Sequence, residues 1–282
     1  MININQWISR DPAQRAFREA VHTILTAIAK TPNLQASMIM KGGVLLALEY
    51  QSSRFTKDID FSTSVRLREF DLARFQTAFE AGLVLAVDQL GYGLDCRVQS
   101  CKQQPPREDA DFPTIQLTVG YANKSDSRSH RRLLTGNSSQ VVQVDYSLNE
   151  PEGSPEVVTF DDGDVIRAYS LVDLVAEKFR AILQQEVRKR ARRQDIYDLY
   201  FLLIEQRKAQ DDWCKLKIVN SLREKAAARN LPVERGSMAN PEIIRRTQAD
   251  YQLLVAEIEG DLLPFKQVYS AVQAFYESLP WV

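Results

Sequence analysis

Two patterns of apolar and polar positions divide the chain into two parts. Up to about residue 160, helical patterns such as 11–30 and 67–90 alternate with short stretches that read as strands. From residue 171 onward, the apolar positions recur at helical spacing alone. The expected strands are 37–40, 58–61, 94–100, 114–121, 141–146 and 157–160. The expected later helices are 171–185, 194–208, 212–229, 240–259 and about 264–278.

A domain boundary is predicted near residues 160–170. A turn-like Asp161-Asp162-Gly163-Asp164 segment lies there, and Ser170 with Asp173 three residues later resembles a helix-capping box. We therefore expect an α/β core with an N-terminal helix over residues 1–165 and a helical bundle over residues 166–282. The fold class is α+β, with a mixed sheet, flanking helices and a C-terminal helical domain.

The composition is ordinary for a soluble globular protein, with 282 residues, 44% of them apolar and 26% charged. No apolar run reaches the length of a membrane span, and the N-terminus lacks the pattern of a secretory signal. Three cysteines and two histidines show no metal-ligand spacing, which argues against a zinc site. A cytoplasmic location is expected, without contact to a membrane.

The net charge of −1 provides no global basic field. Binding of nucleic acid would therefore depend on local patches. Two such patches stand out. The denser is Arg188-Lys189-Arg190-Ala191-Arg192-Arg193, and the second holds Arg128, His130, Arg131 and Arg132 in what reads as a loop. Each is either a solvated surface segment or a phosphate-contacting patch.

The segment Lys41-Gly42-Gly43 separates a strand candidate from a short apolar helix over 44–50. Glycines in such a place let the backbone approach a ligand, and the N–H groups at the start of the helix attract anions. Taken alone, the glycine pair favours a plain tight turn. Its interest comes from the acids that follow it.

Asp58 and Asp60 lie two residues apart on a strand candidate, so both carboxylates project from the same face. Two carboxylates on one face repel each other unless a cation or hydrogen-bond donors neutralise them. Magnesium, which prefers a few carboxylates together with phosphate oxygens, is the usual solution. The alternative is a solvent-facing strand with two acids that have no function.

Asp145 is the one acid in the apolar strand candidate 141–146. Acids are poorly tolerated in strands unless they are exposed or partnered. A third carboxylate beside Asp58 and Asp60 would complete a nucleotidyl-transfer site, as general base or metal ligand. The alternative is an exposed aspartate at a strand end.

Five segments follow one another in a fixed order: Lys41-Gly42-Gly43, Arg54-Phe55-Thr56-Lys57-Asp58-Ile59-Asp60-Phe61, Val144-Asp145-Tyr146-Ser147, Glu177-Lys178-Phe179-Arg180-Ala181 and Arg193-Gln194-Asp195-Ile196-Tyr197-Asp198-Leu199. Together they make residues 38–205 similar to the AbiEii/AbiGii-type toxin nucleotidyltransferases of the DNA polymerase β-type superfamily. Gln194 departs from the pattern, because the family often has a basic residue there.

The resemblance implies a nucleotidyltransferase fold and transfer of a nucleotide from an NTP in the presence of Mg²⁺. It makes Asp58, Asp60 and Asp145 metal ligands, and it adds Lys178 and Asp195 to the catalytic residues. Read without the family, Lys178 would be an ordinary exposed lysine. Under the resemblance, Asp198 is structural.

The residues expected to bind the nucleotide come from both parts of the chain. Arg54 and Thr56 precede the aspartate strand closely enough to line its pocket, and Lys178 would contact the triphosphate as a point charge. The full set is Lys41, Gly42, Gly43, Arg54, Thr56, Lys178 and Arg193.

The resemblance also implies a role and partners. The chain would be the toxin of a bacterial toxin–antitoxin or phage-defence pair, with an antitoxin protein as partner. The acceptor would be RNA, with a tRNA 3′ end as the leading candidate, or else a protein hydroxyl. A non-catalytic module that binds an antitoxin is the alternative from another class.

Overall fold

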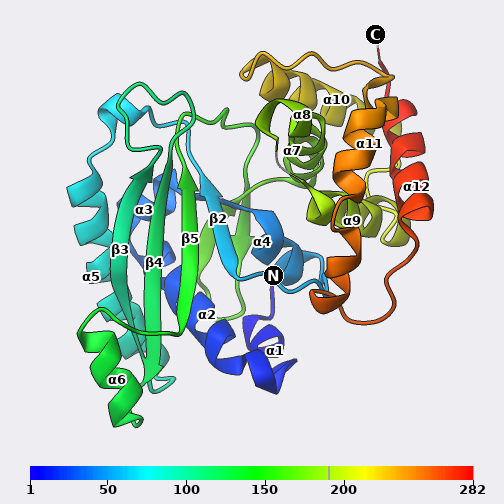
Figure 1. Ribbon diagram of the computed structural model, residues 1–282. Helices are drawn as coiled ribbons and strands as arrows, with labels where there is room; N and C mark the ends of the chain where they lie inside the picture. The colour runs from blue at the N-terminus through cyan, green and yellow to red at the C-terminus, as the bar shows by residue number, and fades with distance from the viewer. Residues whose placement is uncertain (190, 282) are drawn as a thin grey trace. The chain divides into compact units, whose positions relative to one another are not determined.

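The computed structural model describes residues 1–189 and 191–281, and the chain divides into two compact units (Figure 1). The first unit comprises Met1–Glu49 and Thr56–Ala168. The second comprises Tyr50–Phe55 and Tyr169–Val282. A short segment near the start of the chain therefore belongs to the second unit, although the chain before and after it belongs to the first. The sequence did not predict this crossing.

The first unit is built on one seven-stranded mixed sheet in the order β3-β4-β5-β2-β1-β7-β6. The pairs β2–β5 and β1–β7 are parallel, and the remaining neighbours are antiparallel. The strands are β1 Ile39–Lys41, β2 Asp58–Ser62, β3 Leu94–Gln104, β4 Thr114–Asn123, β5 Val141–Ser147, β6 Glu156–Thr159 and β7 Val165–Ala168.

Two long helices cover the apolar face of this sheet. α2 and α5 pack on each other and against the strands, and Ile59, Leu117 and Val144 beneath them are fully buried. Successive residues of a strand point to opposite faces, so the strand neighbours of these three residues point to the other face of the sheet. The helices of the first unit are α1 Ile4–Ser9, α2 Arg15–Lys30, α3 Pro32–Ser37, α4 Gly42–Glu49, α5 Leu72–Leu90 and α6 Ser127–Leu134.

The second unit is helical. Its core includes Phe179, whose ring stacks on Phe275 at 6.5 Å and tilts against Tyr276 at 5.1 Å. The helices are α7 Leu171–Leu183, α8 Gln185–Arg188, α9 Arg193–Tyr200, α10 Asp212–Ala227, α11 Pro241–Gln248 and α12 Phe265–Glu277. A π-helical turn, Phe201–Glu205, continues α9, and a 3₁₀ helix, Tyr251–Ala256, follows α11.

The α+β arrangement predicted from the sequence is confirmed, and so are most of its elements. Local signals explain several differences. Pro32 starts α3 and delays β1 to Ile39–Lys41. Asp250 adopts the left-handed conformation at φ 59°, which ends the helical pattern expected over 240–259. The strand β7, which pairs with both β6 and β1, was not predicted.

The segment around Arg131 is not the loop that the sequence suggested. It forms α6, because Asp126 accepts hydrogen bonds from the backbone N–H groups of Arg128 and Ser129 and so caps the helix. Among the described residues, no helix is long and apolar enough to cross a membrane.

Candidate active site

Gly42 forms the turn between β1 and α4, and its backbone conformation is one that favours glycine. Its φ is +76°, in the left-handed region. A Cβ atom at this position would lie 2.0 Å from the Oδ2 atom of Asp60. The absence of a side chain therefore lets the Asp60 carboxylate lie directly against the first turn of α4.

The acids of β2 and β5 meet on one face of the sheet. β2 and β5 are parallel neighbours, and Asp60 stands directly beside Asp145 in their register. Asp58 lies two residues before Asp60, so its side chain projects from the same face. Lys41 belongs to β1, the other neighbour of β2, and is paired with Asp60 in the register of these two strands. Three acids and one lysine thus gather next to the Gly42 turn.

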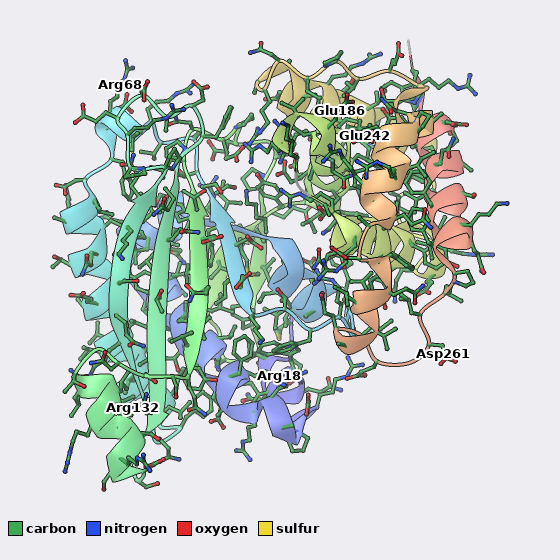
Figure 2. All side chains as sticks on the ribbon, in the orientation of Figure 1. Arg18, Arg68, Arg132, Glu186, Glu242 and Asp261 are labelled. Atoms are coloured by element: carbon green, nitrogen blue, oxygen red, sulfur yellow. The ribbon has the colours of Figure 1, made fainter. Side chains whose placement is uncertain are left out.

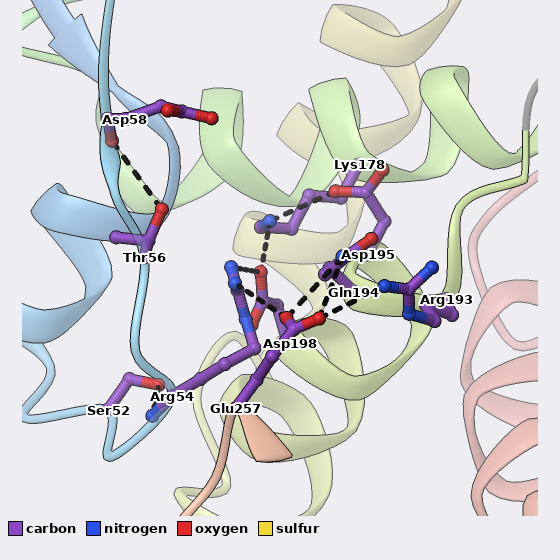
Figure 3. A network of polar contacts seen from close by, with 10 residues as sticks. All are labelled: Ser52, Arg54, Thr56, Asp58, Lys178, Arg193, Gln194, Asp195, Asp198 and Glu257. Atoms are coloured by element: carbon purple, nitrogen blue, oxygen red, sulfur yellow. Dashed lines mark hydrogen bonds and ion pairs between the residues drawn. The ribbon is translucent and has the colours of Figure 1, made fainter. Parts of the chain in front are cut away.

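The groups around this cluster are polar. Gln116 Nε2 donates a hydrogen bond to Asp145 Oδ1 at 3.2 Å, and Lys41 Nζ lies 4.0 Å from Glu150 Oε1. Asp58 is exposed, whereas Lys41 and Glu150 are buried. Thr56 Oγ1 donates to the backbone carbonyl of Asp58 at 3.5 Å, so Thr56 supports the strand (Figure 3).

The donor set suits a magnesium ion that arrives with phosphate oxygens. Among the described residues, no group of three or more His, Cys, Asp or Glu side chains converges closely enough to hold a metal by itself. Magnesium in nucleotide sites usually takes one or two carboxylates and completes its shell with phosphate and water. Asp58, Asp60 and Asp145 suit that requirement, because their carboxylates stand on one face of the sheet beside the turn at Gly42.

A second cluster of candidate residues lies inside the second unit, around the buried carboxylate of Asp198 (Figure 3). Arg54 donates to it twice, from Nε at 2.7 Å and from Nη2 at 2.8 Å. Lys178 Nζ donates to Asp198 Oδ2 at 2.6 Å and to Asp195 Oδ1 at 3.2 Å. One buried acid therefore holds two cations at once.

The pKa shifts of this cluster follow from its charges. Burial alone would raise the pKa of Asp198, but the charges of Arg54 and Lys178 outweigh burial and lower it to about 2. Burial opposes the charge of Lys178, yet Asp198 and Asp195 raise its pKa. Asp198, Arg54 and Lys178 are therefore all held in their charged forms.

Glu257 closes the outer side of this network. Its carboxylate accepts a hydrogen bond from Arg193 Nη2 at 3.1 Å and lies 3.8 Å from Arg54 Nη1. Its backbone carbonyl accepts from the N–H of Phe55 at 2.6 Å. Gln194 also donates to this carboxylate, at 3.4 Å from each oxygen.

The predicted site residues thus form two groups. Lys41, Gly42, Gly43, Thr56, Asp58, Asp60 and Asp145 belong to the first unit, and Arg54, Lys178, Arg193 and Asp195 belong to the second. Lys178 is buried rather than exposed. Asp198, expected to be structural, is the centre of the second group, and Glu257 was missed as a member of it. The spacing of Asp195 and Asp198, three apart on one helix, was a signal that both reach the same partner.

The dense basic run of the second unit is partly engaged in ion pairs. Arg192 lies 3.6 Å from Asp195, and Arg193 binds Glu257. Arg190, a member of the predicted basic run, lies outside the described residues. These contacts of Arg192 and Arg193 are internal to the second unit.

Comparison with known proteins gives the family. Residues 23–277 match the family model described as nucleotidyl transferase AbiEii toxin, type IV TA system. No curated protein matches the chain.

Two solved structures share the fold. MenT4, a nucleotidyltransferase toxin of Mycobacterium tuberculosis H37Rv, is 14% identical over 98% of this chain and 89% of its own, with a TM-score of 0.56. JHP933 from Helicobacter pylori is 15% identical over 95% and 92%, with a TM-score of 0.52. The fold class and the family predicted from the motifs are both confirmed. The chain belongs to the AbiEii family of nucleotidyltransferase toxins of type IV toxin–antitoxin systems.

Proposed function

We propose that this nucleotidyltransferase transfers a nucleoside monophosphate from a magnesium-bound NTP to the 3′ end of an RNA, with tRNA as the leading candidate. The observation that supports the site is the register of Asp60 beside Asp145, next to the close approach of Asp60 to Gly42. RNA is preferred over a protein hydroxyl because exposed arginines, such as Arg128 and Arg131, lie on the same unit.

Each residue of the first unit has a role in this proposal. The phosphates would lie against the N–H groups at Gly42 and Gly43. Asp58, Asp60 and Asp145 would hold magnesium, which neutralises phosphate charge when it is bound. Asp145 would also accept the proton of the acceptor hydroxyl. The acceptor oxygen forms a bond to the α-phosphorus, and the bond to the departing pyrophosphate breaks.

The role of Lys178 and Asp195 toward the nucleotide stays a prediction. Lys178 already neutralises Asp198 and Asp195 within the second unit. A change of Lys178 to Met would therefore disturb the folding of α7 and α9 as well as any contact with phosphate. For this reason, the primary test uses the aspartates of the first unit.

The test incubates the protein with each labelled NTP, Mg²⁺ and total RNA, and separates RNA from protein on gels. We expect the wild type to label RNA, and Asp58→Ala and Asp60→Ala to lose the transfer while keeping the wild-type unfolding midpoint. Full transfer by either variant would refute the site. A labelled protein band without labelled RNA would replace the RNA acceptor with a protein hydroxyl.

The toxin role calls for a test in cells. We propose that the chain slows bacterial growth, that an antitoxin protein partner relieves this effect, and that the pair serves in phage defence. Expression of the wild type should slow growth, whereas Asp58→Ala at equal expression should not. Equal growth of the two strains would contradict the toxic role of the transfer, and the gel assay would still report on the chemistry.

A further inference from the structure

The face of the sheet that carries the three acids continues as a polar surface across β5, β4 and β3. In register beside Asp58 stand Gln143, Thr118 and Ser100, and beside Asp145 stand Gln116 and Lys102. We call this surface the polar sheet face. It consists of Ser100, Lys102, Thr114, Gln116, Thr118 and Gln143.

Hydrogen bonds link neighbouring strands across this face. Ser100 Oγ donates to Thr118 Oγ1 at 3.1 Å, and Thr118 Oγ1 donates to Gln143 Oε1 at 3.0 Å. Gln116 connects the face to Asp145. Lys102 and Gln116 are exposed, although the opposite face of the same strands is buried under α2 and α5. These side chains therefore offer amides, hydroxyls and an ammonium group to a ligand.

The order of the strands decides which substrate lies over this face. The phosphate-binding turn at Gly42 lies on the β1 side of the acids, whereas β5, β4 and β3 lie on the other side. In phosphoryl transfer, the attacking oxygen and the leaving oxygen stand roughly in line on opposite sides of the phosphorus. If pyrophosphate leaves on the β1 side, the acceptor hydroxyl approaches from the β5–β4–β3 side.

Charge favours an RNA strand as the acceptor on this face. α6 packs over its end, because a Cβ atom at Gly120 of β4 would meet the Leu133 side chain at 2.9 Å. Gly120 lies four residues along β4 from Gln116, or about 13 Å at the rise of a strand. Exposed arginines of α6 are Arg128, Arg131 and Arg132 (Figure 2 labels Arg132). The loop at the opposite end of β3 and β4 carries Glu108, Asp109 and Asp111.

We propose that the polar sheet face binds the single-stranded 3′ segment of an RNA acceptor, with its phosphates toward α6 and its terminal hydroxyl at Asp145. This inference rests on the proposed function, since it assigns the acceptor side of the same site. None of the six side chains is aromatic, so the face offers no stacking platform for bases. Its amides and hydroxyls bond to sugar and phosphate oxygens, and the binding tolerates different base sequences.

Binding is tested without NTP, by fluorescence anisotropy of a labelled single-stranded RNA at several salt concentrations. The variants are Lys102→Glu and the double change Arg128→Glu with Arg131→Glu. The matched control is Arg74→Glu, an exposed arginine of α5, which packs on the opposite face. We expect the affinity to fall about tenfold. The slope of log affinity against log salt concentration should become shallower by about one for each arginine or lysine removed. The control should bind as the wild type.

Transfer assays separate this inference from the proposed function. In both variants, the KM for RNA should rise while kcat and the thermal shift induced by Mg–NTP stay at wild-type values. Wild-type binding and KM in both variants would overturn the polar sheet face as the acceptor surface even if RNA is labelled. Binding that weakens only in these variants, without any transfer to RNA, would support the surface and overturn the proposed reaction. A wild type that binds no RNA would overturn the inference.

Discussion

Gly42 is the residue on which the approach of Asp60 to the start of α4 depends. Two separate constraints apply to it. Its φ of +76° costs any other residue roughly 1–2 kcal/mol. In addition, a Cβ atom would overlap the Asp60 carboxylate at 2.0 Å. The first constraint acts on the backbone, and the second acts on a side chain proposed to bind metal.

We therefore predict that Gly42→Ala reduces nucleotide transfer about 100-fold, the order of magnitude for displacing a catalytic group by about 1 Å. The new methyl group overlaps the carboxylate of Asp60 and forces it to move. The carboxylate then leaves its position beside Asp145. The measurement is the rate of transfer of labelled nucleotide at saturating NTP, together with the midpoint of urea unfolding.

Gly91 provides the matched control for the backbone constraint. It ends α5 with a φ of +62°, but no atom of the described residues lies within 4 Å of where its Cβ would be. Gly91→Ala should lower stability by about 1 kcal/mol and leave transfer unchanged. If both variants lost the same fraction of activity, the contact between Gly42 and Asp60 would not be what matters for catalysis.

Among the elements of the second unit, Asp198 joins three. It belongs to α9 and binds Lys178 of α7 and Arg54 of the Tyr50–Phe55 segment. Burying charges is costly, and removing one partner of a buried pair leaves the others uncompensated, typically at about 3–5 kcal/mol. Asp198 therefore holds these elements together more than Asp195, which is partly exposed and contacts Lys178 at a longer distance.

The lowered pKa of Asp198 predicts a dependence of stability on pH. Its pKa of about 2 lies below the ordinary value of 3.8, so the folded state prefers the ionised form. The resulting stabilisation, about 2 kcal/mol, is complete above pH 4 and is lost as the pH falls toward 2. Asp198→Asn should thus be less stable than the wild type at pH 6, and the difference in unfolding free energy should shrink between pH 4 and 2.

Glu242 provides a control for this pH experiment. Its pKa is also lowered to about 2, chiefly by a hydrogen bond with Arg245, but on an exposed surface of α11 where solvent screens the charges. Glu242→Gln should therefore follow the wild type at every pH. If the difference in unfolding free energy between the wild type and Asp198→Asn stayed constant from pH 6 to 2, folding would not lower the pKa of Asp198.

How far the sequence predicts these elements depends on the range of the interactions. The alternation in β4 and β5 assigns Leu117 and Val144 to one face and Gln116 and Asp145 to the other, because strand geometry has a period of two. The direction of Asp58 and Asp60 follows in the same way. β7 has only four residues, too few for a clear alternation, and its partner β1 is distant in sequence, so local periodicity does not reveal it.

Contacts between distant segments set the rest of the site. That Asp60 lies beside Asp145 depends on β2 and β5 being parallel neighbours, which neither strand encodes by itself. Arg54 binds Asp198 across 144 positions of the chain, and Glu257 lies in a part where no motif stood out. Lys178 was predicted from its local sequence to be exposed, because the acids that bind it, Asp195 and Asp198, are not its neighbours in the chain.

On the scale of the whole molecule, the path of the chain makes the second unit depend on an early segment. Residues 50–55 belong to it although they precede most of the first unit. Within this segment, Arg54 neutralises Asp198, and the N–H of Phe55 donates to the carbonyl of Glu257. A cut at the boundary between Ala168 and Tyr169 removes both interactions from the helices.

We therefore predict that the fragment 169–282 is destabilised by about 3–5 kcal/mol relative to the same fragment with residues 50–55 joined to its N-terminus by a flexible linker. In the fused fragment, Arg54 again neutralises Asp198. Its Arg54→Ala variant should lose most of the gain, because Lys178 alone then faces the buried carboxylate. Urea unfolding followed by circular dichroism measures all three proteins. If the unfused fragment unfolded at the same urea concentration as the fused one, the segment 50–55 would not contribute to the folding of the helical unit.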